Sequence, residues 1–550
     1  MLGVSKETLN KIAGVSFPGW ENYERHIGTD VTIIAFAKPM HSRLPLFKNA
    51  KPVSEDTATN EVQPSQMRLY WLLWCLVVGV LLIPIWTTRY LPLVDYPHAL
   101  ARGYIAAHYD DVASFQQIYE RPLAVVPNLG FEAIAKVAGR VMNIELIGRL
   151  TWTLTIGLFA LGCHLISVTF FGKPLWTSLL AIFFIYSTHL FYGNINFLLG
   201  LALFLILFAV WRRLFVDRPW LSAILLLLGT PINFLIHLGT YAFEATAIGI
   251  SLLFALRSNK ISYLRAVGQV APVAATLLLF KLFLTHGGTV GQIAFNGPIE
   301  KLLETASLIS TYRHSWDAVY VILLLVTVIF VVRKKSSLYF QPEALTIGCA
   351  FYLFLWLCPG TLFTSSGADV RFLVPAFVFG LLSVRFVMEK RTLQYCIGFL
   401  ILLGSVRIVL IDVDWHSLSD RIAPQIALWQ ELPAGASAYP LYYRDSLAVR
   451  PDGKLLPVIG LYGILNRQIY NPIFYAFREQ HPIVFRTLPD FKPLNTAHDL
   501  TQSFAATQLL HYDYIWCYRI SQEGLTNLKK SGHAIDSADG AILMKMDAFK

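Results

Sequence analysis

The sequence predicts an all-α polytopic membrane domain of about eleven transmembrane helices, followed by a small extracytoplasmic α/β domain. Of its 550 residues, 55% are hydrophobic and 15% are charged, whereas soluble domains carry about 25% charged residues. The apolar residues form runs of roughly 20, the length of helix that crosses a bilayer core. The net charge of +10 comes from basic clusters between these runs. Such clusters are typical of cytoplasmic loops, so we expect a lipid bilayer and no nucleic acid as partner.

The transmembrane domain is expected at residues 69–411, with its first helix at 70–88 and a long outside loop at 89–146. Each later helix is predicted from a separate apolar run. These runs fall at 147–171, 175–192, 195–214, 219–237, 239–256, 266–285, 317–332, 343–359, 371–388 and 394–411. Residues 1–68 lack the pattern of a signal peptide. They are interpreted as a poorly patterned cytoplasmic tail, or as sequence before a later start at Met67.

The distribution of Lys and Arg predicts the orientation of these helices. With the N-terminus inside, every predicted inside loop is basic, and the outside loops are short and nearly uncharged or mixed in sign. The inside residues are Lys173, Arg212, Arg213, Arg218, Arg257, Lys260, Arg265, Arg333, Lys334, Lys335, Lys390 and Arg391. An odd number of helices places the C-terminal region outside. We therefore expect a bacterial inner-membrane protein with a cytoplasmic N-terminus and a periplasmic C-terminal domain.

Residues 412–550 are expected to form the extracytoplasmic domain. An amphipathic helix is predicted at 420–431 and a turn at 451–453. Short runs rich in aromatic and apolar residues predict strands at 436–443, 512–518 and 541–546. No arrangement of Cys and His in the chain has the spacing of a zinc or iron site.

Polar residues gather at the outer ends of the predicted helices. An ionisable group at the centre of a membrane helix costs about 2.5–3.5 kcal/mol, so such residues are candidates for function. Five outside connections each contribute His, Asp, Glu, Asn or Arg. The candidate substrate-binding residues are His98, Arg102, His189, Asn196, His237, Glu244, Arg313, Asp369 and Arg371.

The segment Asp95-Tyr96-Pro97-His98, a few residues past the first helix, is the strongest candidate for chemistry. A helix that starts at Tyr96 brings Asp95, His98 and Arg102 to one face, at spacings of three and four. A carboxylate beside an imidazole can act as a general base. Asp95 is equally well placed to cap that helix, with Pro97 in the first turn. The two roles do not exclude each other.

The other candidates also have structural interpretations. His189 and His237 either position a substrate or pack with a hydrogen-bonded ring. Asn196 either binds a sugar hydroxyl or satisfies the backbone of a tight turn. Arg371 has the planar fork that suits a phosphate, but it can also pair with Asp369 or anchor a helix end. Glu244 lies inside a predicted helix, which a purely structural role explains poorly.

The order of these features resembles that of the membrane glycosyltransferases of the C-type fold. In those proteins an acidic residue, here Asp95, follows the first helix and precedes two short interfacial helices, here about 96–108 and 128–142. The stretch 367–375, with Arg371 before an aromatic residue and a proline, is similar to the family's late motif. The resemblance extends over residues 70–550 as architecture. The first loop lacks the Asp-x-Asp or Asp-Glu pair of better-known members, so we expect no metal cofactor.

The resemblance implies transfer of a sugar from a polyprenyl-phosphate donor to an acceptor lipid, glycan or protein at the outer face. Asp95 would then be the general base, and Arg371, with Arg102 or Arg313, would hold the donor phosphate. Two alternatives remain at this point. One is a transporter, for which Glu244 and Lys281 are the supporting residues, although the chain has no internal repeat. The other is a catalytically inactive scaffold in envelope assembly.

Overall fold

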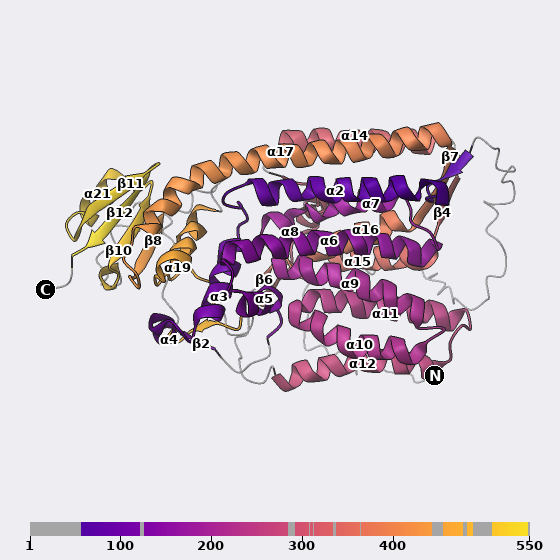
Figure 1. Ribbon diagram of the computed structural model, residues 1–550, viewed down its shortest axis with the longest axis horizontal. Coiled ribbons are helices and arrows are strands. Elements are labelled where there is room, and N and C mark those ends of the chain that lie inside the picture. Colours follow the sequence, from indigo (N-terminus) through magenta and orange to yellow (C-terminus); the bar gives the residue numbers. More distant parts are fainter. Residues whose placement is uncertain are drawn as a thin grey trace, which may run out of the picture. The chain divides into compact units, whose positions relative to one another are not determined.

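Apolar helices make up most of the computed structural model, as the hydrophobic runs predict (Figure 1). The structure describes residues 57–550 except 122–125, 284–291, 307, 312, 334–336, 364, 443–454, 477–480, 488–508 and 548–550. Among the described residues, seven helices are long and apolar enough to cross a membrane. They are α2 (Met67–Thr87), α6 (Ile144–Phe171), α9 (Ile195–Leu214), α10 (Pro219–Ile236), α11 (Leu238–Arg257), α14 (His314–Arg333) and α17 (Lys390–Gln430). The chain is therefore a multi-pass membrane protein.

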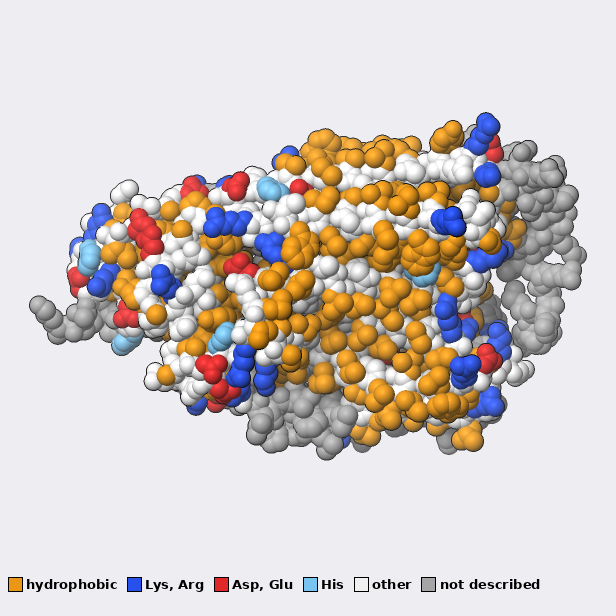
Figure 2. Space-filling model, in the orientation of Figure 1, with side chains coloured by type: hydrophobic (Ala, Val, Ile, Leu, Met, Phe, Trp, Pro, Cys, Tyr) orange, Lys and Arg blue, Asp and Glu red, His pale blue; other side chains and the backbone are white. Residues whose placement is uncertain are grey.

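Shorter apolar helices occupy the positions of the remaining predicted spans. These are the broken stretch α7 (Thr177–Ala181), η3 (Ile182–Ile185) and α8 (Thr188–Phe191), then α12 (Tyr263–Phe283), α15 (Pro342–Leu357), and η5 (Val370–Phe372) with α16 (Leu373–Leu382). Figure 2 shows hydrophobic side chains over α2, α6, α9 and α10, with Lys and Arg gathered at the end where β4 and β7 lie. Such a band between charged ends is what a bilayer requires.

Three expected boundaries are wrong. The helix predicted at 371–388 ends at Leu382, and the strand β7 (Val384–Glu389) follows it. The helix predicted at 175–192 is broken into three short turns. The predicted helices at 394–411 and 420–431 are one helix, α17, because no residue between them interrupts the backbone ladder. The first proline within α17 is Pro424, well inside its second half.

Residues 57–66 belong to the folded unit. The strand β1 (Thr57–Thr59) pairs antiparallel with β7, which also pairs with β4 (Ser337–Phe340). Asn60 and Val62 are buried, and the side chain of Asn60 accepts a hydrogen bond from the backbone of Phe386. The expectation of a poorly patterned tail therefore does not hold for these residues. Residues 1–56 lie outside the described part of the chain.

The C-terminal region contains a four-stranded sheet in the order β11-β12-β10-β8. Its strands are β8 (Ala438–Tyr442), β10 (Tyr514–Tyr518), β11 (Gly532–Ala538) and β12 (Ala541–Met546), and α21 (Gln522–Leu528) lies between β10 and β11. The three predicted strands are confirmed as β8, β10 and β12. β8 and β10 are parallel, and the other pairs are antiparallel. The predicted turn at 451–453 lies outside the described residues.

Further short elements lie at the ends of the membrane helices. They include α3 (Tyr96–His108), α4 (Ala113–Ile118), α5 (Gly130–Ala138), α13 (Pro298–Ala306), η6 (Leu456–Leu461) and α19 (Tyr462–Arg467). The strand pairs are β2 (Tyr119–Glu120) with β9 (Val484–Phe485), and β3 (Gln292–Ala294) with β5 (Thr361–Phe363), which also pairs with β6 (Ser365–Ser366). Tyr90 stacks edge-on against Tyr462 of α19, with 5.3 Å between ring centroids. A large hydrophobic core runs through the membrane helices and the C-terminal region, and a second, smaller cluster lies between the C-terminal sheet and α21.

Candidate functional site

The segment before α3 is held against the turn between α8 and α9. The backbone N–H of Asp95 donates to the carbonyl of Tyr192 at 2.7 Å. Gly193, in the same turn, has a left-handed φ of 76°. A side chain at this position would also bring its Cβ within 2.7 Å of the Tyr96 nitrogen. The turn therefore needs glycine for both conformation and space, and this close packing fixes the position of Asp95.

Asp95 occupies the N-cap position of α3 without acting as a cap. Its side chain accepts no hydrogen bond from the helix backbone, so the capping interpretation is wrong. Among the described residues it also forms no ion pair within 4.0 Å, and it is partly exposed. Burial raises the pKa of Asp95 to about 6, although the charges of Arg102 and Arg371 lower it. The carboxylate is thus available to a ligand and close to two guanidinium groups.

Arg371 lies in η5, at the start of the α16 helix. Its Nη2 donates to Ser365 Oγ at 2.8 Å, and the guanidinium lies 5.9 Å from the centroid of the Phe197 ring. The Nε of Arg371 is buried and has no hydrogen-bond partner among the described residues. A buried donor without a partner is costly. A ligand oxygen at this place would satisfy it.

His189 and His237 surround the Phe197 ring beside Arg371. Their rings lie 4.6 Å and 5.3 Å from that ring. His189 Nε2 is 3.2 Å from the carbonyl of Val370 and can donate to it. His237 caps α11, since its Nδ1 accepts from the backbone of Gly239 at 3.1 Å. Asn194 Nδ2 lies 3.4 Å from His189 Nδ1, so both ring nitrogens of His189 and the Nδ1 of His237 have partners. The two histidines therefore support the surroundings of Arg371.

His98 and Arg102 extend from α3 on the same side as Asp95. The backbone N–H of Tyr475 donates to His98 Nδ1 at 3.1 Å, and burial lowers the pKa of His98. Arg102 is also buried, and its Nε donates to Glu132 of α5 at 2.8 Å. This ion pair ties α3 to α5 and keeps a positive charge near Asp95.

Asn196 and Glu244 have partners away from the Asp95 carboxylate. Asn196 Oδ1 accepts from the backbone of Phe131 at 2.6 Å, and its Nδ2 donates to Glu132 Oε2 at 2.9 Å. Asn196 therefore anchors the start of α5. Glu244 is fully buried between α10 and α11, where Oε2 accepts from Asn233 at 2.8 Å.

Asp369 is the N-cap residue of η5. Its Oδ1 accepts from the backbone of Val370 at 2.9 Å, and its Oδ2 accepts from Lys301 of α13 at 2.7 Å. Lys301 also donates to the carbonyls of Leu355 and Cys358. Because both members of the ion pair are buried, Asp369 fixes the start of the segment that carries Arg371.

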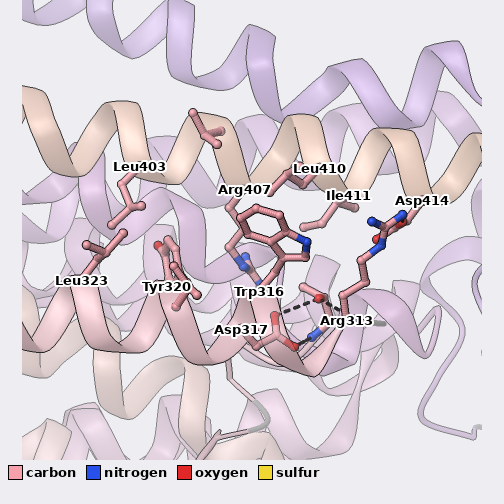
Figure 3. Close-up of a pocket in the computed structure, with 13 residues that line it drawn as sticks. Arg313, Trp316, Asp317, Tyr320, Leu323, Leu403, Arg407, Leu410, Ile411 and Asp414 are labelled. Atoms are coloured by element: carbon pink, nitrogen blue, oxygen red, sulfur yellow. Dashed lines mark hydrogen bonds and ion pairs between the residues drawn. The ribbon is translucent and has the colours of Figure 1, made fainter.

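Arg313 lies at a cavity of about 140 Å³ between α14 and α17 (Figure 3). Its Nη2 is 2.5 Å from Asp414 Oδ1. Leu323 and Leu403 line the opposite end of the cavity, so only one end is polar. Arg407 lies between the two ends of the cavity and donates to two backbone carbonyls. Within the described residues, Arg313 makes no ion pair with Asp95.

The structure thus brings Asp95, His98, Arg102 and Arg371 into one site, with His189 and His237 beside Arg371. Sequence reasoning missed Tyr475, Glu132 and Lys301. Glu132 could have been found from the sequence, because an acidic residue on the short amphipathic helix that follows Arg102 is a natural ion-pair partner for that arginine. Tyr475 and Lys301 had no such signal. Among the described residues, no three His, Cys, Asp or Glu side chains are grouped to hold a metal.

No protein-family model and no curated protein matches the chain. Among solved structures, it is similar to that of ArnT from Cupriavidus metallidurans bound to undecaprenyl phosphate. The match has 10% sequence identity and a TM-score of 0.48, and it covers 87% of this chain and 98% of the other. An identity and a TM-score this low establish neither a shared family nor a shared activity. The chain's own helices identify it as a multi-pass membrane protein with a sheet-containing C-terminal region.

Proposed function

We propose that the protein transfers a sugar from a polyprenyl-phosphate donor to an acceptor at the outer face of the bacterial inner membrane. The observation that carries this proposal is the environment of the Asp95 carboxylate. It begins a helix that it does not cap, is partly exposed, and lies close to two arginines. The sequence resemblance to C-type membrane glycosyltransferases, which also place an acidic residue here, supports the same function.

In this reaction Asp95 accepts the proton of an acceptor hydroxyl as its oxygen attacks the anomeric carbon of the sugar. The bond between the anomeric carbon and the donor phosphate oxygen breaks, and the phosphate leaves with the electron pair. Arg371, with its unpartnered Nε, and Arg102 stabilise the negative charge that develops on the leaving phosphate. The pKa of Asp95, raised to about 6, suits a base that is ionised at neutral pH and still takes up a proton readily.

The test is release of free polyprenyl phosphate by the protein in lipid nanodiscs. The donors are a panel of polyprenyl-phosphate sugars, and the acceptor is a membrane extract. We expect the Asp95→Asn variant to be at least about a hundredfold slower, as for loss of a general base. Asp420→Asn removes an exposed carboxylate from α17 and serves as the matched control. Equal rates for Asp95→Asn and the wild type would remove Asp95 from this role.

A flux assay on the same protein in sealed vesicles separates this proposal from transport. Uptake of a donor sugar without release of polyprenyl phosphate would favour a transporter. Release that depends on Asp95, without net flux, supports the transferase.

A further inference from the structure

Tyr475 is exposed although the chain around it is buried. Residues 471–476 follow α19, and of these six only Tyr475 is exposed, at 44% of its surface. Its neighbour Phe474 is buried between the rings of Tyr119 and Phe485, at 5.6 Å and 5.9 Å between centroids. Phe474 therefore anchors the segment, and the next side chain points out of the core.

The Tyr475 ring is held by His98. The two rings are nearly parallel, with an interplanar angle of 3° and 4.0 Å between centroids. The hydrogen bond from the Tyr475 backbone to His98 Nδ1, at 3.1 Å, fixes the same pair at a second point. His98 is fully buried in α3, one turn after Asp95. The aromatic ring is thus rigid before any ligand binds.

The fixed ring lies beside the candidate base. Burial and, after it, the charge of Asp95 raise the pKa of the Tyr475 phenol, which places the phenol within electrostatic reach of that carboxylate. One face of the ring is covered by His98, and the side chain nevertheless keeps 44% of its surface accessible.

We propose that Tyr475 is a platform on which a pyranose ring of the substrate stacks next to Asp95, and that His98 positions this platform. The C–H groups on one face of a pyranose are apolar and pack on an aromatic ring, while its hydroxyls stay available to polar groups such as the Asp95 carboxylate. A rigid aromatic ring provides contact area with little loss of conformational entropy. This inference rests on the proposed function, since it names the class of ligand that the same site binds.

The first test compares substitutions of Tyr475 in the release assay. We expect Tyr475→Ala to raise the KM for the sugar substrate about tenfold with a smaller change in kcat, because it removes the flat apolar surface on which the sugar ring packs. Tyr475→Phe and Tyr475→Trp keep the flat surface and stay within about threefold of the wild type. Tyr263→Ala removes another exposed tyrosine, at the start of α12, and is the matched control.

The second test concerns His98 as a positioning residue. His98→Ala should raise KM as Tyr475→Ala does, and the double variant should be no worse than either single one. His98→Asn can still accept the Tyr475 backbone hydrogen bond through its side-chain oxygen, so it should recover part of the lost affinity. Additive effects of the two alanine substitutions would show that His98 does not act through Tyr475.

Binding of methyl glucopyranoside and methyl galactopyranoside, followed by saturation-transfer NMR in nanodiscs, distinguishes failure of this inference from failure of the transferase proposal. Saturation transfer to the pyranosides that disappears in Tyr475→Ala supports the platform, even if no donor is turned over. Equal transfer in the wild type and Tyr475→Ala, or none in either, would overturn it. Turnover unaffected by Tyr475→Ala would overturn it as well, while leaving Asp95 as the base.

Discussion

Replacing Asp95 by Asn should make the protein more stable at neutral pH while it removes activity. The pKa of the Asp95 carboxyl is raised from 3.8 to about 6, mainly by burial. The folded protein therefore binds this proton more tightly than the unfolded chain does. The stabilisation that this tighter proton binding provides is fully present below pH 3.8 and is lost as the pH rises through about 6. At neutral pH the wild type carries a charge that its fold disfavours, and Asn carries none.

The size of the effect follows from the pKa difference. Each pKa unit corresponds to 1.36 kcal/mol, so the ionised carboxylate costs the fold up to about 3 kcal/mol, and solvent at the partly exposed side chain lowers this to about 2 kcal/mol. Arg102 and Arg371 already offset part of the cost of burial. A site that holds a charged group at a net cost is typical of catalytic positions, where activity is gained at the expense of stability.

The assay is thermal unfolding of both proteins in the same nanodiscs between pH 4 and pH 8. The Asn variant should unfold about 2 °C above the wild type at pH 8, and the difference should shrink as the pH falls below 6. Asp420→Asn, on an exposed part of α17, should show no such pH-dependent difference. A less stable Asn variant at pH 8 would refute the reasoning, because it would mean that the two arginines outweigh the cost of burial.

Three further outcomes are expected. The rate of polyprenyl phosphate release should rise with pH through about 6, since only ionised Asp95 accepts a proton; a flat profile between pH 5 and 8 would contradict this. Lys301→Met should destabilise the fold by about 3–5 kcal/mol, because it leaves the Asp369 charge buried without its partner. Adding Asp369→Asn should recover at least half of this loss in thermal unfolding. Gly193→Ala should lower the release rate more than the unfolding temperature, since its Cβ would displace the Tyr96 backbone next to the base; full activity would speak against this close contact.

The C-terminal domain boundary at residue 412 and the orientation of the chain remain predictions. Labelling of single cysteines introduced into β7 and into β12 with a membrane-impermeant reagent would test the orientation, since we expect only the C-terminal sheet to be accessible from outside.

The local sequence pattern was enough to predict the helices and strands that depend only on neighbouring residues. The helix predicted from Tyr96 has the same bounds in the structure, because Pro97 suits the first turn of a helix. The strand at 541–546 also agrees. Long apolar runs predicted most membrane helices for the same reason, since burial in lipid depends on composition and length.

The tertiary structure decided everything that depends on partners far away in the sequence. Whether Arg371 lies near Asp95 and which residue covers His98 are questions of packing between segments hundreds of residues apart. The break after Leu382 has the same origin, because β7 forms only by pairing with β1 and β4. The periodicity of a helix indicates which of its residues prefer a nonpolar environment. It does not indicate which distant side chains pack against that face of the helix. The sequence therefore determined a membrane protein with polar residues at the ends of its helices, and only the fold selected the few that form a site.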